Sequence, residues 1–127
     1  MNQQLSDAEL EIMKIVWSSP KEVTLFSDLM EELAARGRPC QKNTLIVLLS
    51  RLVNKGFLHA RKKGRRNEYT PLVPEAEYQT TQTKYFLDKI YAGSAGGLVT
   101  NLISADLLTG AEYEELKSLL EKGSGHT

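Results

Sequence analysis

An amphipathic helix followed by a short cationic hairpin constrains the fold of this 127-residue chain more than any other feature. Over residues 41–55 the leucines recur at helical spacing, and Gly56 stands where helices commonly end on a residue with positive φ. Residues 57–60 and 68–72 have the composition of two short strands, and the basic turn 63–67 separates them. The segment therefore predicts a helix that leads directly into a β-hairpin.

Two further helices are predicted before this segment. Ser6 and Glu9 have the spacing of a capping box at the start of the first helix, and the second helix should begin after Thr24 and end near Pro39. The expected inward-facing residues are Ile12, Met13, Val16 and Trp17 in the first helix and Phe26, Leu29, Met30 and Leu33 in the second. Three helices followed by a basic hairpin is the order of a winged helix-turn-helix domain, which we expect over residues 1–73.

The second half of the chain is predicted to be helical, so the fold class is mainly α with a small β-hairpin wing. The expected elements are a helix at 74–91, a break of small residues at 92–97, a short helix at 98–103 and a last helix that begins at the capping box of Thr109 and Glu112. A helical tail of about 50 residues could hardly bury its apolar side chains alone, so we expect residues 74–122 to form a helical dimerisation domain and residues 123–127 a flexible tail. The residues expected at the dimer interface are Phe86, Ile90, Tyr91, Leu98, Leu102, Leu116, Leu119 and Leu120.

The formal net charge of zero conceals a strong segregation of charge. The segment Arg36–Asn67 holds ten basic residues and no acidic one, which leaves six basic residues and all 16 acidic residues to the rest of the chain. A solvated surface would explain a short basic run. Thirty-two consecutive residues without a carboxylate instead predict that one part of the fold binds an anionic partner.

The two faces of the helix at 41–55 are expected to have different roles. With about 100° per residue, Leu45, Leu48, Leu49 and Leu52 lie on the buried face. The opposite face would be free to enter the major groove of DNA, and its aliphatic pair, Ile46 and Val47, fits contact with thymine methyl groups or packing against another protein. The residues expected to face bases and adjoining phosphates are Lys42, Asn43, Thr44, Ile46, Val47, Ser50 and Arg51.

The cations of the hairpin are expected to have a simpler role. They lie on or beside a tight turn in which Gly64 can adopt positive φ, and they are Arg61, Lys62, Lys63, Arg65 and Arg66. From the hairpin these side chains would reach DNA phosphates beside the helix. Such contacts supply affinity and register but little sequence information.

Several groups of residues along the chain carry a family resemblance. They are Leu5 to Trp17, Thr44-Leu45 with Leu48 to Phe57, Tyr69 with Pro71-Leu72-Val73, Phe86 to Gly93, Leu98-Val99 with Asn101, and Leu108-Thr109 with Glu112 to Leu116. In this order they resemble the penicillinase and methicillin-resistance repressor family (BlaI/MecI) over nearly the whole chain. The resemblance implies a homodimeric transcriptional repressor that binds a pseudo-palindromic DNA operator and whose C-terminal helices interlock with those of a second subunit.

The resemblance also implies a route of release. In the antibiotic-responsive members of the family, a membrane receptor-protease pathway triggers cleavage within the dimerisation domain after an Asn that precedes Phe. The matching bond here joins Asn101 to Leu102, so the sequence leaves open whether it is cleaved. Ile46 and Val47 replace residues that are often polar or basic in the family, so base preference does not carry over. The copper-responsive branch has Cys-x-Cys motifs that this chain lacks, which excludes release by that route.

The sequence gives little support to catalytic or membrane functions. A single cysteine, Cys40, excludes a disulfide framework and a multi-thiolate metal site, and the two histidines, His59 and His126, belong to no set of nucleophile, base and orienting group. We therefore expect no enzyme, no metal and no cofactor. The chain shows no secretory signal and no apolar run long enough to span a membrane, so we expect a cytoplasmic protein without membrane insertion.

Two other functions stay open at this point. The chain could be a winged-helix adaptor in which Ile46 and Val47 pack on a partner protein, and salt would separate this function from phosphate binding. It could also be a regulator gated by a small molecule that binds between its two halves. The sequence shows no distinct ligand pocket, and the tyrosines Tyr78, Tyr85 and Tyr91 are more simply core or dimer contacts.

Overall fold

The computed structural model describes residues 4–123, which belong to two compact units. The first unit ends at Gln82 and the second begins at Thr83. The first unit extends beyond the expected boundary at residue 73 because the ring of Tyr78 packs against Trp17 and Phe57, at centroid distances of 5.7 and 5.6 Å. Residues 124–127, which include His126 and most of the expected tail, lie outside the described residues.

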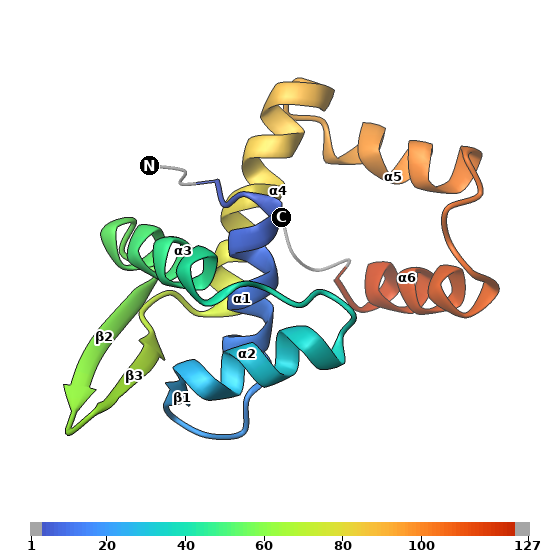
Figure 1. The fold of residues 1–127 in the computed structure, drawn as a ribbon. Coiled ribbons are helices and arrows are strands. Elements are labelled where there is room, and N and C mark those ends of the chain that lie inside the picture. The colour runs from blue at the N-terminus through green and yellow to red at the C-terminus, as the bar shows by residue number, and fades with distance from the viewer. Residues whose placement is uncertain (1–3, 124–127) are drawn as a thin grey trace. The chain divides into compact units, whose positions relative to one another are not determined.

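Most of the described elements are helices, and Figure 1 shows their order along the chain. They are α1 (Asp7–Ser18), β1 (Thr24–Leu25), α2 (Phe26–Ala35), α3 (Lys42–Asn54), β2 (Leu58–Lys63), β3 (Arg66–Pro71), α4 (Glu75–Tyr91), α5 (Ala95–Ser104) and α6 (Gly110–Lys122). The predicted fold class, mainly α with a hairpin wing, is confirmed. Within the part of the chain that the structure describes, we find no helix with the length and apolar character needed to cross a membrane.

The predicted capping boxes set the starts of two helices. At α1, the Ser6 hydroxyl accepts from the Glu9 N–H at 3.2 Å, and the Glu9 carboxylate accepts from the Ser6 N–H at 2.8 Å. At α6, Thr109 and Glu112 exchange the same two hydrogen bonds at 3.1 and 2.9 Å. Each box satisfies two N–H groups that a helix start otherwise leaves without partners, so both boundaries follow from local sequence.

The end of α3 is the one that Gly56 predicts. Gly56 has a φ of +83°, its N–H donates to the carbonyl of Val53 at 3.0 Å, and the N–H of Phe57 donates to the carbonyl of Leu52 at 2.9 Å. These are the two hydrogen bonds of a Schellman motif, which reverses the chain at a helix end. The reversal places Phe57 in the core, where it is buried, and directs the chain away from α3 into β2.

The hairpin belongs to a three-stranded antiparallel sheet in the order β1-β3-β2. The strand β1 was not predicted, because two residues are too few to show an alternating pattern. The predicted five-residue turn at 63–67 is wrong, since Lys63 pairs with Arg66 and leaves only two residues between the strands. The φ of Gly64 is +65°, and positive φ at this position allows a two-residue turn that matches the twist of the strands.

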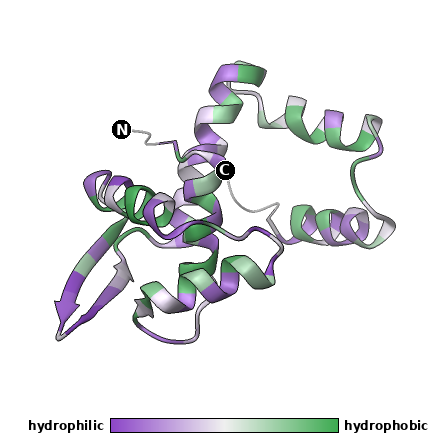
Figure 2. Cartoon of the chain, in the orientation of Figure 1, coloured by the Kyte–Doolittle hydropathy of each residue, from purple (hydrophilic) through white to green (hydrophobic). Residues whose placement is uncertain are grey.

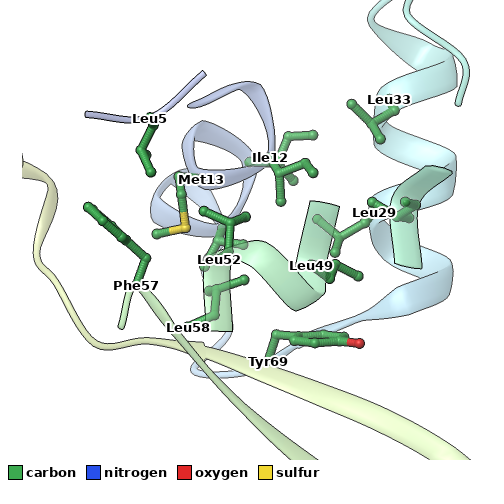
Figure 3. Close-up of a cluster of buried hydrophobic side chains, with 13 residues drawn as sticks. Leu5, Ile12, Met13, Leu29, Leu33, Leu49, Leu52, Phe57, Leu58 and Tyr69 are labelled. Carbon is green, nitrogen blue, oxygen red and sulfur yellow. The ribbon is translucent and has the colours of Figure 1, made fainter. Parts of the chain in front are cut away.

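The core of the first unit lies between α1, α2, α3 and the base of the hairpin (Figure 3). Its most deeply buried apolar residues are Ile12, Met13, Leu29, Leu45, Leu49, Leu52 and Leu58. Most of the predicted inward-facing positions are buried, whereas Trp17, Phe26, Met30 and Leu48 pack against the edge of the core and stay partly exposed. Because these contacts fix only one face of α3, its other face is left on the surface.

The second unit has no comparable core. No residue from Thr83 to Gly123 is buried, and Figure 2 shows hydrophobic segments along α5 and α6. Helix α5 begins at Ala95 rather than at Leu98 as predicted, because the Ser94 hydroxyl accepts from the Gly97 N–H at 2.9 Å and caps the helix before its two glycines. The exposed large apolar side chains of this unit are Tyr85, Phe86, Ile90, Ile103, Leu107, Tyr113, Leu119 and Leu120.

Candidate nucleic-acid interface

All the residues predicted to contact DNA are exposed on the first unit. On α3, Ile46 and Val47 are 48% and 49% exposed, while Leu45 and Leu52 on the opposite face are fully buried. The predicted division of this helix into a core face and an outer face is therefore confirmed. The outer face carries Lys42, Asn43, Thr44, Ile46, Val47, Ser50 and Arg51.

A groove of about 560 Å³ connects this face of α3 to the tip of the hairpin. Lys42 and Ile46 line it from α3, Arg65 and Arg66 line it from the hairpin, and no lining residue is acidic. The remaining lining residues are Leu25, Phe26, Ser27, Asn67 and Tyr69. The groove thus brings Lys42 of α3 and the two arginines of the hairpin turn, which are more than 20 residues apart in the sequence, to one surface.

The start of α2 borders the same groove, which was not predicted from the sequence. Phe26 and Ser27 form the first turn of α2, and the N–H of Leu25 before them donates to the carboxylate of Asp28 at 3.0 Å. The first N–H groups of a helix attract anions. An acidic residue three positions after a helix start is the sequence signal that could have placed this turn, although only the fold places it beside the hairpin.

The register of the hairpin divides its cations between two faces. Lys62 shares a face with the buried Tyr69, whereas Arg61 lies on the other face, directly opposite Glu68. Lys63 and Arg66 form the last pair before the turn, on the same face as Arg61. The five cations therefore differ in their surroundings, and Arg61 has a carboxylate as its cross-strand neighbour.

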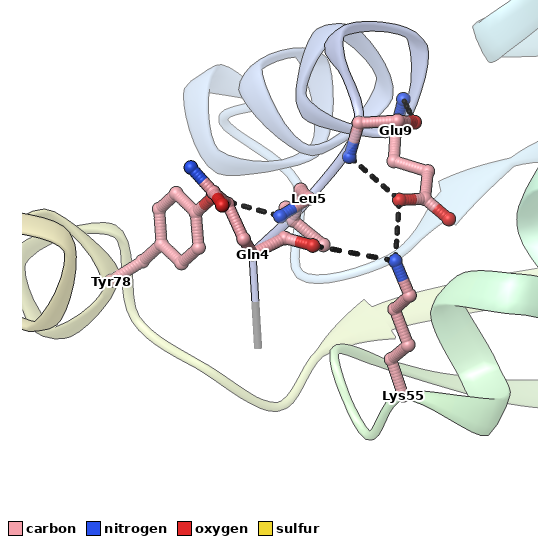
Figure 4. Close-up of polar contacts among 6 residues, drawn as sticks. Gln4, Leu5, Glu9, Lys55 and Tyr78 are labelled. Carbon is pink, nitrogen blue, oxygen red and sulfur yellow. Dashed lines mark hydrogen bonds and ion pairs between the residues drawn. The ribbon is translucent and has the colours of Figure 1, made fainter. Parts of the chain in front are cut away.

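One cation of the basic segment is used inside the fold. The Lys55 ammonium lies 2.7 Å from the carboxylate of Glu9 and 3.5 Å from the carbonyl of Gln4, as Figure 4 shows. Burial of Glu9 raises the pKa of its carboxyl, but hydrogen bonds from Lys55 and Ser6 and the charge of Lys55 outweigh that effect and leave the pKa below its ordinary value. Lys55 thus joins the end of α3 to the start of α1.

The ion pairs reduce the ten cations of the basic segment to seven. Arg36 lies 3.2 Å from Glu32, Arg38 lies 3.6 Å from Glu11, and Lys55 pairs with Glu9. Across residues 4–123 the structure gives no ion pair to the other seven, which are Lys42, Arg51, Arg61, Lys62, Lys63, Arg65 and Arg66. These are the same seven cations that were predicted to contact DNA. Within this segment, the cations without an ion pair therefore all lie on α3 and the hairpin, and among them Arg61 has Glu68 as its cross-strand neighbour.

The other predicted site residues lie in the second unit. Asn101 and Leu102, the residues of the expected cleavage site, are in the last turn of α5, and the side-chain amide of Asn101 donates to the hydroxyl of Tyr91 at 3.0 Å. Of the predicted interface residues, Phe86, Ile90, Leu119 and Leu120 are exposed, and Tyr91, Leu98, Leu102 and Leu116 are half-buried. The exposed Ile103, Leu107 and Tyr113 add to this apolar surface and were not predicted.

Comparison with known proteins agrees with the resemblance seen in the sequence. The family model of the penicillinase repressor matches residues 5–122. The penicillinase repressor of Bacillus licheniformis is 36% identical over 119 residues, which are 94% of this chain and 91% of that protein. The methicillin resistance regulatory protein MecI of Mammaliicoccus sciuri is 32% identical over 94% of each chain.

A solved structure is also similar to part of the chain. The solution structure of the Bacillus licheniformis BlaI monomeric form in complex with the blaP half-operator matches with a TM-score of 0.50 and 35% identity. The match covers 61% of this chain and 92% of that one. Together with the family match over almost the whole chain, these similarities show that the protein belongs to the penicillinase repressor family.

Proposed function

We propose that this protein is a transcriptional repressor that binds a DNA operator through α3 and the β2–β3 hairpin. The observation that carries the proposal is the set of seven unpaired cations around the exposed face of α3, beside a groove without acidic residues. Duplex DNA is a polyanion whose major groove admits a helix, and cations at the helix and hairpin can neutralise its phosphates. The similar BlaI structure, which contains a half-operator, supports the same assignment. In this proposal the protein acts in the cytoplasm and is not an enzyme.

The repressor would act as a homodimer on a pseudo-palindromic operator. The second unit supports this step, because its helices are capped and well formed although none of its described residues is buried. Covering this exposed apolar surface with a second copy of the chain would remove it from water and stabilise the unit. A two-fold dimer would present two α3 helices to two half-sites, which explains why a pseudo-palindromic operator suits it.

Release would follow from cleavage of the bond between Asn101 and Leu102 by a membrane receptor-protease pathway. This bond lies inside α5, so a protease that binds an extended chain would first have to unwind the helix and break the hydrogen bond from Asn101 to Tyr91. Cleavage there would cut the surface proposed to form the dimer and so lower operator affinity. Intact protein after co-expression with the cognate receptor would contradict this route of release.

Fluorescence anisotropy with DNA tests the proposed function directly. The probes are a duplex from the region upstream of the gene and a random duplex of equal length, each at a low and a moderate salt concentration. We expect saturable binding to the upstream duplex that exceeds binding to the random duplex and weakens strongly with salt. Equal and weak binding to both, or binding that salt does not change, would contradict a repressor and favour a protein-interaction adaptor.

The role of the hairpin has a separate test. Replacing two of its exposed cations, Arg65→Ala/Arg66→Ala, should weaken binding to specific and random duplexes alike, because the double variant removes groups that bind phosphate in any sequence. The slope of log K against log salt should become shallower by about 0.9 for each phosphate that is no longer neutralised. An unchanged slope would show that the hairpin does not bind phosphates.

A further inference from the structure

The exposed face of α3 carries apolar side chains at its centre. Ile46 and Val47 are each about half exposed, at 48% and 49%, on a helix whose opposite face packs into the core. Burial of aliphatic surface is favourable, so an aliphatic pair at the centre of a charged binding surface indicates an apolar contact in the complex. The phosphates of a nucleic acid cannot supply that contact.

The surroundings of the pair narrow the choice of partner. Asn43 and Ser50 lie one helical turn from Val47, and Lys42 lies one turn from Ile46. The groove beside Ile46 is bordered by Arg65 and Arg66, and the sequence has no carboxylate between Arg36 and Asn67. The charge of this surface therefore selects a polyanion, and the aliphatic pair requires that the polyanion also present apolar atoms where a helix can reach them.

We propose that Ile46 and Val47 recognise the 5-methyl groups of thymine in the major groove of the operator. The proposal rests on the proposed function and specifies which base this chain selects within each half-site. Thymine presents a methyl group in the major groove, and an aliphatic side chain makes favourable contact with it. Neither Ile46 nor Val47 can form a hydrogen bond through its side chain, so a donor or acceptor of a base edge placed against them would lose its hydrogen bond to water without replacement.

The residues next to the pair fit the same selection. Asn43 lies on the same face as Val47 and carries an amide, the group that pairs with both the donor and the acceptor of adenine in the major groove. A site read by Asn43 and the aliphatic pair would therefore contain A·T and T·A pairs. Double-stranded RNA is disfavoured, because its major groove is too deep and narrow for side chains to read and its uracil lacks the methyl group.

Deoxyuridine gives an experiment that removes only the methyl group. The full chain would first enrich duplexes from a randomised pool, and each thymine of the enriched duplex would then be replaced singly by deoxyuridine. At one or two positions in each half-site we expect affinity to fall about fourfold, the equivalent of one buried methyl group. The variants Ile46→Ala and Val47→Ala should each abolish this sensitivity at one of those positions while thermal melting shows both to be folded.

The outcomes separate this inference from the proposed function. Enrichment of a specific duplex whose affinity no deoxyuridine changes would overturn the thymine contact and leave the repressor assignment intact. Equal sensitivity to deoxyuridine in the wild type and both alanine variants would assign the methyl contacts to other side chains and also overturn it. Failure to enrich any duplex would contradict the proposed function itself, and salt-independent capture of a protein would then identify the pair as a protein contact.

Discussion

Helices α3 and α6 are each 13 residues long and amphipathic, yet their leucines have opposite environments. Leu49 of α3 is 2% exposed, whereas Leu119 and Leu120 of α6 are 58% and 62% exposed. Both helices have a capped end, since α3 ends in a Schellman motif and α6 begins with a capping box. Whether a leucine is buried depends on the other elements that pack against its helix. In the first unit α1, α2 and the base of the hairpin cover one face of α3, whereas α6 is not covered in this way. The first unit thus has a buried core of its own, whereas none of the described residues of the second unit is buried.

The largest expected effect is the loss of stability when a substitution creates a cavity in the core of the first unit. Leu49→Ala removes side-chain atoms from a buried position and should lower the free energy of unfolding by about 3 kcal/mol. Leu119→Ala in α6 is the matched control, since it shortens an exposed leucine and should change the stability of the first unit by less than about 0.5 kcal/mol. Urea unfolding of the full chain at low protein concentration measures both. Equal losses would contradict the contrast between the units.

A smaller loss is expected when the buried carboxylate of the first unit is neutralised. Glu9→Gln removes the charge that Lys55 contacts and should cost about 2 kcal/mol at pH 7, the range of hydrogen bonds to charged groups. The pKa of Glu9 is lowered in the folded chain, so its carboxylate stabilises the fold above the unfolded pKa of about 4.3. This contribution disappears as the pH falls through the lower, folded-state pKa.

Urea unfolding of the wild type and Glu9→Gln over a pH series tests that sign. The difference between the two proteins should be constant near neutral pH and shrink in acid, where Glu9 is protonated and resembles Gln. A difference that stays the same from neutral pH into acid would show that packing, and not the ion pair with Lys55, is responsible. Lys55→Gln should meanwhile leave the salt dependence of DNA binding unchanged, because Lys55 is engaged inside the fold.

The sequence predicts those parts of this molecule that depend on near neighbours in the chain. Ser6 with Glu9 and Thr109 with Glu112 act across three residues, and Gly56 acts on the helix turn before it. Ser94 also acts across three residues, but the two glycines that follow it hide the helix start from a propensity argument. The outer face of α3 was predictable because helical spacing alone separates it from the core leucines.

The features that the sequence did not predict depend on residues far apart in the chain. Strand β1 exists because Thr24 pairs with Tyr69, and Lys55 is withdrawn from the surface because Glu9, 46 residues earlier, is buried beside it. The same holds for the candidate site, where the basic segment was visible but its division into paired and unpaired cations was not. To predict that division one must know where acidic residues from outside the segment lie in the fold, such as Glu11 beside Arg38.

The exposed leucines of the second unit should affect assembly without affecting the first unit. Leu120→Ala removes aliphatic surface from the proposed interface of both copies and should weaken the dimer about tenfold, which corresponds to about 1.4 kcal/mol. Sedimentation velocity over a concentration series measures this change. Binding to a duplex with one half-site should be unchanged, whereas binding to a duplex with two half-sites should weaken. An unchanged dimer would place the interface elsewhere on the unit.

The smallest expected effect is a difference in salt dependence between hairpin cations that have a carboxylate neighbour and those that do not. Arg61 faces Glu68 across the hairpin, so Arg61→Ala removes a charge that is already partly compensated and should reduce the slope of log K against log salt by less than the 0.9 or so expected for a full phosphate contact. Lys117→Ala is the matched control in the second unit, because Lys117 lies 3.8 Å from Glu114 on α6 and should not change the slope at all. Anisotropy titrations of one half-site duplex at several salt concentrations rank the variants without interference from dimer formation.

If Arg61→Ala reduced the slope as much as Arg65→Ala, Glu68 would have no influence on the cation opposite it, and the whole hairpin would bind phosphate uniformly. If Lys117→Ala reduced it, DNA would contact the second unit as well, and the two units would differ in how they are buried but not in what they bind.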